Sequence, residues 1–136
     1  MYNPIIIHTD GACSNNQDRE KSVGGWAYLL EYNGKTKSDS GKVILTTNNR
    51  MEMLAIIKAL GALKRFDLPI EIHSDSNYVI NTITNNWKRN KNQDLWEQLD
   101  HLLSNFDEIK FIKVKAHADN AKNNLVDQLA VKASLS

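Results

Sequence analysis

Four acidic side chains in this sequence stand where carboxylates could perform chemistry. Two of them, Asp10 and Asp75, each come directly after a short apolar run that is typical of a buried β-strand. If the two strands are parallel neighbours, both carboxylates emerge at the same edge of the sheet, where open α/β sheets bind their ligands. Carboxylate oxygens suit the hard cations Mg²⁺ and Mn²⁺, so the placement points to a metal site.

The other two acidic residues, Glu52 and Asp127, lie on predicted helices. Glu52 falls in the first turn of a helix expected over 50–63, and the positions three, four, seven and eleven residues later are all apolar. The positions three and four residues after Asp127 are apolar as well. A carboxylate on a core-facing stripe is costly unless it is paired or binds a cation. Each of the four alone could equally be a helix-terminal charge or a strand-end cap, but together they favour one metal site.

A histidine and several asparagines stand near these positions. His117 lies in a polar loop beyond a predicted strand, ten positions before Asp127. A loop histidine is usually only solvated, although beside a metal site it can shuttle protons or help product leave. Asparagines just after strands or at helix starts are commonly turn formers and caps. Clustered at one crevice, they could instead contact base edges and 2′-hydroxyls across a minor groove. They are Asn15, Asn16, Asn48, Asn49 and Asn77.

The bulk properties describe an ordinary globular chain. Its 136 residues, 41% hydrophobic and 24% charged, predict one compact domain over 1–136. No apolar run approaches the ~20 residues of a membrane-spanning helix. The N-terminus has no leader pattern, so we expect Met1 to be the true start of a cytoplasmic protein. Cys13 is the only cysteine, which excludes an internal disulfide and a multi-cysteine zinc cluster.

Charge neither demands nor excludes a nucleic-acid partner, because the formal net charge is +1. One basic-aromatic stretch, 87–91, combines a tryptophan with lysine and arginine and suits phosphate contact. A solvated loop is an equally good interpretation of it.

Hydrophobic patterning predicts the order β-β-β-α-β-α-α-β-α. Asn33-Gly34 is the strongest hairpin signal. Early antiparallel strands followed by strand–helix crossovers predict an α/β fold, with one mixed sheet and helices packed on its faces. The expected strands are 5–9, 24–32, 35–44, 70–74 and 110–115, and the expected helices are 50–63, 77–84, 94–103 and 124–133.

The segments around these residues resemble the motifs of the ribonuclease HI family. They are TDGACSNN (9–16), TTNNRMEM (46–53), SDSNYV (74–79), DLWEQLD (94–100) and KAHADNAKNNLVDQLA (115–130). They occur in the family's order and cover essentially the whole chain. One Asp-Gly or Asp-Ser dipeptide would carry no signal, but the combination is highly specific.

This resemblance implies a ribonuclease H-like fold, with a five-stranded mixed sheet and helices on both faces. It implies a monomer that hydrolyses the RNA strand of RNA–DNA hybrids with two Mg²⁺ ions, Mn²⁺ being possible, and leaves 5′-phosphate and 3′-hydroxyl ends. Its metal-binding carboxylates fall on Asp10, Glu52, Asp75 and Asp127, and its catalytic-loop histidine falls on His117. Hybrid contacts fall on Asn16 (or Asn15), Asn48, Asn49, Asn77 and the backbone near Cys13, while Thr47 and Asn92 match positions that help hold a DNA-strand phosphate.

The sequence departs from the family in its basic handle, of which only 86–93 remains before DLWEQLD. Two rival functions stay open at this point. One is a catalytically silent hybrid-binding module, which is disfavoured because all four acidic positions and His117 are occupied by competent residues. The other is a DNA-acting nuclease or strand-transfer enzyme of the same fold superfamily, which the asparagine-rich motifs disfavour.

Overall fold

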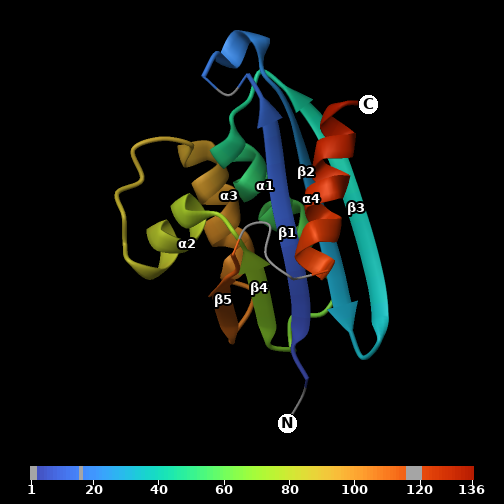
Figure 1. Cartoon of the computed structure of the whole chain (residues 1–136). Helices are drawn as coiled ribbons and strands as arrows, with labels where there is room; N and C mark the ends of the chain where they lie inside the picture. The colour runs from blue at the N-terminus through green and yellow to red at the C-terminus, as the bar shows by residue number, and fades with distance from the viewer. Residues whose placement is uncertain (1–2, 16, 116–120) are drawn as a thin grey trace.

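A five-stranded mixed sheet in the order β3-β2-β1-β4-β5 forms the centre of the computed structural model (Figure 1). The structure describes residues 3–15, 17–115 and 121–136. β1, β2 and β3 pair antiparallel, while β4 and β5 continue the sheet parallel to β1. The predicted mixed sheet is therefore confirmed. The strands are β1 (Ile5–Ser14), β2 (Val23–Tyr32), β3 (Lys35–Ile44), β4 (Ile70–Ser74) and β5 (Ile109–Lys113).

The β2–β3 hairpin turns at Asn33 and Gly34, as expected. Their φ angles are 49° and 81°, the left-handed values that a two-residue hairpin turn of this kind requires at both positions. Asparagine and glycine adopt such angles more readily than other residues, so this dipeptide sets where the chain reverses.

Four α-helices among the described residues cover both faces of the sheet (Figure 1). Trp26 and Tyr28 of β2 belong to the main core, which includes α1, whereas Ala27 and Leu29 pack against α4 on the opposite face. Because side chains alternate along a strand, this division confirms helices on both faces. The helices are α1 (Asn48–Gly61), α2 (Asn77–Thr84), α3 (Gln93–Leu103) and α4 (Ala121–Ser134), and a 3₁₀ turn, η1, covers Arg19–Lys21.

Several element boundaries differ from the predicted ones. β1 continues five residues beyond the expected end at residue 9, because its backbone keeps pairing with β2 as far as Ser14 opposite Val23. α1 starts two residues early, at Asn48, because the Thr47 hydroxyl accepts the Arg50 backbone N–H at 3.2 Å and so caps the helix. α4 begins at Ala121 instead of 124 and β5 at Ile109 instead of 110.

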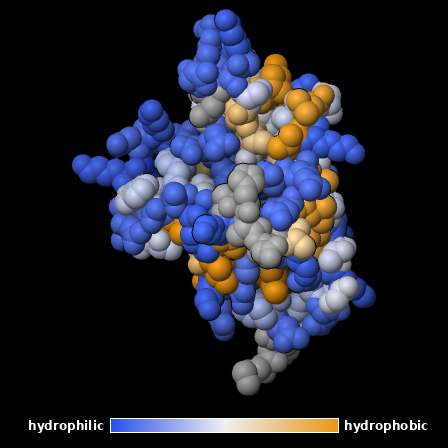
Figure 2. Space-filling model, viewed as in Figure 1, coloured by the Kyte–Doolittle hydropathy of each residue, from blue (hydrophilic) through white to orange (hydrophobic). Residues whose placement is uncertain are grey.

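A glycine lets α4 pack closely on the sheet. A Cβ atom at Gly25 of β2 would lie 2.0 Å from the carbonyl oxygen of Ala130. Only a residue without a side chain allows this approach, and α4 carries Asp127 on the next turn. None of the helices described here has the length and apolar character needed to cross a membrane. The face of the molecule drawn in Figure 2 is mostly hydrophilic, with smaller apolar patches between the polar residues.

Candidate active site

The structure brings three of the four predicted carboxylates together. Asp10, Glu52 and Asp75 each offer one carboxylate oxygen, and these atoms lie within 4.8 Å of one another. The parallel pairing of β1 with β4 aligns His8 with His73, two residues before Asp10 and Asp75 respectively. That register carries both aspartates to the same end of neighbouring strands, as predicted.

Asp10 itself is not at a strand end, which corrects the prediction. It lies inside β1 opposite Ala27 of β2, whereas Asp75 does follow the last residue of β4. β1 is longer than β4 at this end because β2 continues to hydrogen-bond to it beyond the last residue of β4. The backbone of Asp10 is therefore held in place by its pairing with β2.

Glu52 reaches the cluster because α1 crosses β1 closely at Gly11. A Cβ atom at Gly11 would lie 2.5 Å from the backbone nitrogen of Glu52 and equally close to the Met51 carbonyl carbon. The Gly11 N–H donates to Asp10 Oδ1 at 2.9 Å and also to Glu52 Oε1. One backbone donor thus binds two of the carboxylates.

The predicted apolar stripe beside Glu52 is largely confirmed. Ala55, Ile56 and Ala59 are fully buried, whereas Leu63 is half-buried and lies beyond the end of α1. Because α1 begins at Asn48, Glu52 lies in its second turn and not in its first.

Burial dominates the electrostatics of the cluster. Asp10 and Glu52 are each 4% exposed. Burial raises the pKa of Asp10 to about 7, with Asp75 and Asp127 adding to the rise. Burial likewise raises the pKa of Glu52 well above its usual range, and Asp10 and Asp75 reinforce it. No ion pair found among the described residues joins a lysine or arginine to this cluster. A bound cation would offset the charge of such a cluster.

Asp127 approaches the cluster from α4. It is half-buried, and its carboxyl group adds to the raised pKa of Asp10. It is not a member of the group of three whose oxygens lie within 4.8 Å. The stripe predicted beside it is only half correct, because Ala130 is fully buried but Val131 is 40% exposed.

Two predicted site residues, Asn16 and His117, lie outside the described residues. Asn15, the alternative to Asn16, has a φ of 55° and donates its side-chain amide to the Lys21 carbonyl at 3.2 Å. That contact makes Asn15 a turn former in this structure.

Three of the remaining predicted contact residues lie at the starts of helices. Asn48 and Asn49 are exposed in the first turn of α1, and Asn77 is exposed at the first position of α2, two residues after Asp75. Cys13 is half-buried with its sulfur 3.8 Å from the Thr46 carbonyl oxygen, and burial raises its pKa.

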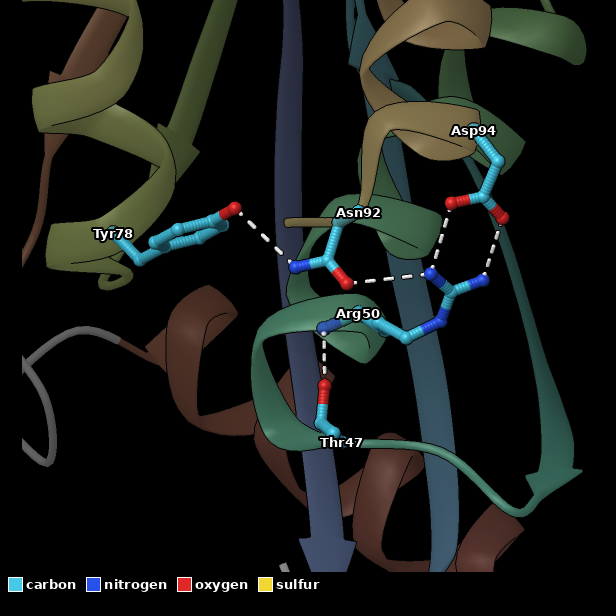
Figure 3. Close-up of polar contacts among 5 residues, drawn as sticks. All are labelled: Thr47, Arg50, Tyr78, Asn92 and Asp94. Carbon is cyan, nitrogen blue, oxygen red and sulfur yellow. Dashed lines mark hydrogen bonds and ion pairs between the residues drawn. The ribbon is translucent and has the colours of Figure 1, made fainter. Parts of the chain in front are cut away.

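The structure adds a network beside Thr47 that the motifs did not reveal (Figure 3). Arg50 forms a two-pronged ion pair with Asp94, with distances of 3.0 and 2.8 Å, and also donates to Asn92. Asn92 in turn donates to the Tyr78 hydroxyl. One signal for Arg50 was present in the sequence: an arginine in the first turn of a helix opposes the helix dipole and needs a local anion.

The three carboxyl groups lie beside the carboxyl end of β4, an edge where open α/β sheets bind ligands, and their oxygens suit a hard divalent cation. The RNase H family model matches residues 2–135, and the chain belongs to that family. The predicted family resemblance is therefore confirmed.

Similar proteins agree in sequence and in fold. Ribonuclease H of Thermoanaerobacter sp. (strain X514) is 45% identical, with 93% of this chain and 86% of that protein aligned. The RNase H1 structure from the halophilic archaeon Halobacterium salinarum NRC-1 superposes with a TM-score of 0.78 at 27% identity, covering 96% of this chain and 97% of that one. LC11-RNase H1, solved in complex with an RNA/DNA hybrid, has a TM-score of 0.80 at 23% identity over 97% and 99% of the two chains, a likeness of fold alone.

Proposed function

We propose that this chain hydrolyses the RNA strand of RNA–DNA hybrids and leaves 5′-phosphate and 3′-hydroxyl ends. The observation that carries the proposal is the group of Asp10, Glu52 and Asp75, whose oxygens lie within 4.8 Å of one another. Relatives at 45% identity are named ribonuclease H, and a structural neighbour was solved with an RNA/DNA hybrid. Residues 1–136 would act as one catalytic domain and as a monomer.

The donor set fits a hard divalent cation, Mg²⁺ or alternatively Mn²⁺. All three clustered ligands are oxygens, and two of them belong to buried carboxyl groups, whose charge is costly unless a cation binds. Asp10, Glu52, Asp75 and Asp127 would hold two ions. When bound, the ions supply an activated water and stabilise the departing 3′-oxygen.

The protein's own residues fix the geometry of this site. The Gly11 N–H holds the oxygens of Asp10 and Glu52, so the two carboxylates are positioned before any ligand arrives. Asp75 is half-buried and leaves the cluster open on the substrate side. His117 would transfer protons during turnover.

Selection of the hybrid needs different contacts to its two strands. Asn16 (or Asn15), Asn48, Asn49 and Asn77, with the backbone near Cys13, would contact base edges and 2′-hydroxyls in the groove. Thr47 and Asn92 would contact a phosphate of the DNA strand. The exposed first turn of α1 places Asn48 and Asn49 next to Thr47.

A cleavage assay with an end-labelled hybrid tests the proposal. We expect the wild type to cut the RNA strand with Mg²⁺ or Mn²⁺ and not with chelator. Asp10→Asn should reduce cleavage to background with an unchanged circular dichroism spectrum, while Asp67→Asn, at an exposed carboxylate outside the cluster, should retain it. Full activity of Asp10→Asn would refute the assignment of the site.

Parallel substrates separate the rival functions. Hybrid binding without cleavage by the wild type would identify a silent binding module, and cleavage of double-stranded DNA would identify a different nuclease. Double-stranded RNA should remain intact, because its second strand lacks the deoxyribose that the other contacts require.

A further inference from the structure

Asn92 has an unusual backbone and a side chain that does not serve its own helix. It precedes α3 with φ 61° and ψ 33°, in the left-handed region, and makes no side-chain capping bond. Its carbonyl oxygen accepts the first backbone N–H bonds of α3, from Leu95 at 3.0 Å and Trp96 at 2.9 Å. The carboxamide is therefore available for contacts with other elements.

Two residues from other helices fix the orientation of that carboxamide (Figure 3). Arg50 Nη1 donates to Asn92 Oδ1 at 3.3 Å, and Asn92 Nδ2 donates to the Tyr78 hydroxyl at 3.2 Å. A guanidinium can only donate, so the oxygen of the carboxamide must face Arg50 and its NH₂ group must face Tyr78. Turning the carboxamide over would lose the bond to Arg50.

Both flanking residues are themselves held in place. The planar guanidinium of Arg50 binds both oxygens of Asp94, an arrangement that a lysine cannot reproduce. The Tyr78 hydroxyl also accepts the Trp96 indole N–H at 3.0 Å. A hydroxyl that accepts two hydrogen bonds still has its own hydrogen to donate, and within the described residues no acceptor takes it.

The surroundings favour an anion at this place. The first turn of α1 contains no acidic residue of its own, and a helix N-terminus favours negative charge. The charge of Arg50 is already paired with Asp94, so Arg50 orients the carboxamide and adds no free charge. Asn92 retains a second N–H on its NH₂ group beyond the one given to Tyr78. Together with the free hydrogen of Tyr78, this presents donors from two helix starts to the same region.

We propose that Arg50 and Tyr78 are positioning residues for the DNA strand, holding the Asn92 carboxamide with its NH₂ group ready to donate to a backbone phosphate. The inference rests on the proposed function, in which Asn92 contacts that strand. Arg50 and Tyr78 then govern substrate affinity and leave the cleavage step to the carboxylate cluster.

Steady-state kinetics on a labelled hybrid test this division. Arg50→Lys keeps the charge but loses the fork, and Tyr78→Phe keeps the ring contact with Trp96 but loses the hydroxyl. We expect each to raise KM about five- to tenfold, the loss of one to two hydrogen bonds, with kcat changed by less than about twofold. The matched control is Arg65→Lys, at a similar exposed two-pronged pair with Asp67, and its KM should not change.

A double-mutant cycle distinguishes positioning from general weakening. If Arg50 acts through Asn92, the pair Arg50→Lys and Asn92→Ala should have the same KM as Asn92→Ala alone. Replacing phosphates of the DNA strand by uncharged methylphosphonates should raise the KM of the wild type and leave that of Arg50→Lys nearly unchanged.

The outcomes separate this inference from the proposed function. A wild type that cleaves no hybrid would refute the proposed function. A wild type that cleaves, with Arg50→Lys and Tyr78→Phe matching the Arg65→Lys control in KM, would refute only the positioning role. Additive effects in the cycle, or a lowered kcat accompanied by a lowered Tm, would also refute it by showing a purely structural contribution.

Discussion

Replacing Asp10 by asparagine should stabilise the metal-free protein above neutral pH while it removes the activity. Asp10 is 4% exposed, and burial raises its pKa from 3.8 to about 7, helped by Asp75 and Asp127. An asparagine oxygen can still accept the Gly11 N–H, but it carries no charge into the cluster. The variant therefore keeps the contact to Gly11 and no longer buries a charge at this position.

The size of the effect follows from the pKa of Asp10. The folded protein binds the Asp10 proton more tightly than the unfolded chain, so its free energy of unfolding falls as pH rises from about 4 to about 7. Three pKa units correspond to a loss of about 4 kcal/mol above that range. The carboxyl groups of Asp10 and Glu52 interact, so part of this loss belongs to Glu52 and persists in the variant. We therefore expect the variant to gain about 2 to 4 kcal/mol in its free energy of unfolding.

Thermal unfolding in chelator measures the gain. At about pH 9 the variant should melt several degrees above the wild type. The gap should shrink as pH falls and nearly close at about pH 4, where the unfolded chain also binds the Asp10 proton. Mg²⁺ should stabilise the wild type more than the variant and narrow the gap. Asp67→Asn serves as the control with the opposite sign, because Arg65 lowers the pKa of that exposed carboxyl. A gap that is equal at both pH values, or a variant that melts below the wild type at the higher one, would refute the reasoning.

Three further predictions concern the rest of the machinery. His117→Ala should slow turnover without abolishing it in the hybrid assay, and an unchanged kcat would leave the histidine as loop surface. Gly25→Ala should lower the free energy of unfolding by about 2 kcal/mol or more and lower activity, because its Cβ would meet the Ala130 carbonyl oxygen at 2.0 Å. The control is Gly61→Ala, which has open space around it and should unfold in urea like the wild type. A basic segment grafted into 90–93 should lower KM for the hybrid, and an unchanged KM would argue that the short handle does not weaken substrate binding.

Most of the fold could be predicted because the residues that determine each strand, helix or turn are close together in the sequence. The Asn33-Gly34 turn and the apolar strand before Asp75 each depend on residues that are close together in the sequence. The end of β1 was missed because Gly11 to Ser14 have no strong strand preference of their own. Their extended backbone comes from pairing with β2, a contact that only the assembled sheet supplies.

Some features of the candidate site could likewise be predicted from local sequence, and others could not. Burial of Glu52 followed from the helical period, because three of the apolar positions after it are indeed buried. The period failed at Asp127, where Val131 faces solvent and the packing of α4 on β2 decides which residues are covered. Arg50 and Asn92 are 42 positions apart, and no periodicity along the chain links them.

The first turns of α1 connect the two halves of the proposed chemistry. Thr47 belongs to the contacts proposed for the DNA strand, and Arg50 is proposed to position Asn92, the other such contact. Glu52 belongs to the cluster proposed to act on the RNA strand. A helix rises about 1.5 Å per residue, so Thr47 and Glu52 stand roughly 7 to 8 Å apart along a rigid axis. That axis is fixed against β1 at Gly11, where α1 and the strand meet without an intervening side chain. α1 therefore sets a fixed offset between the phosphate contact and the carboxylates, and only a duplex whose two strands match that offset can occupy both.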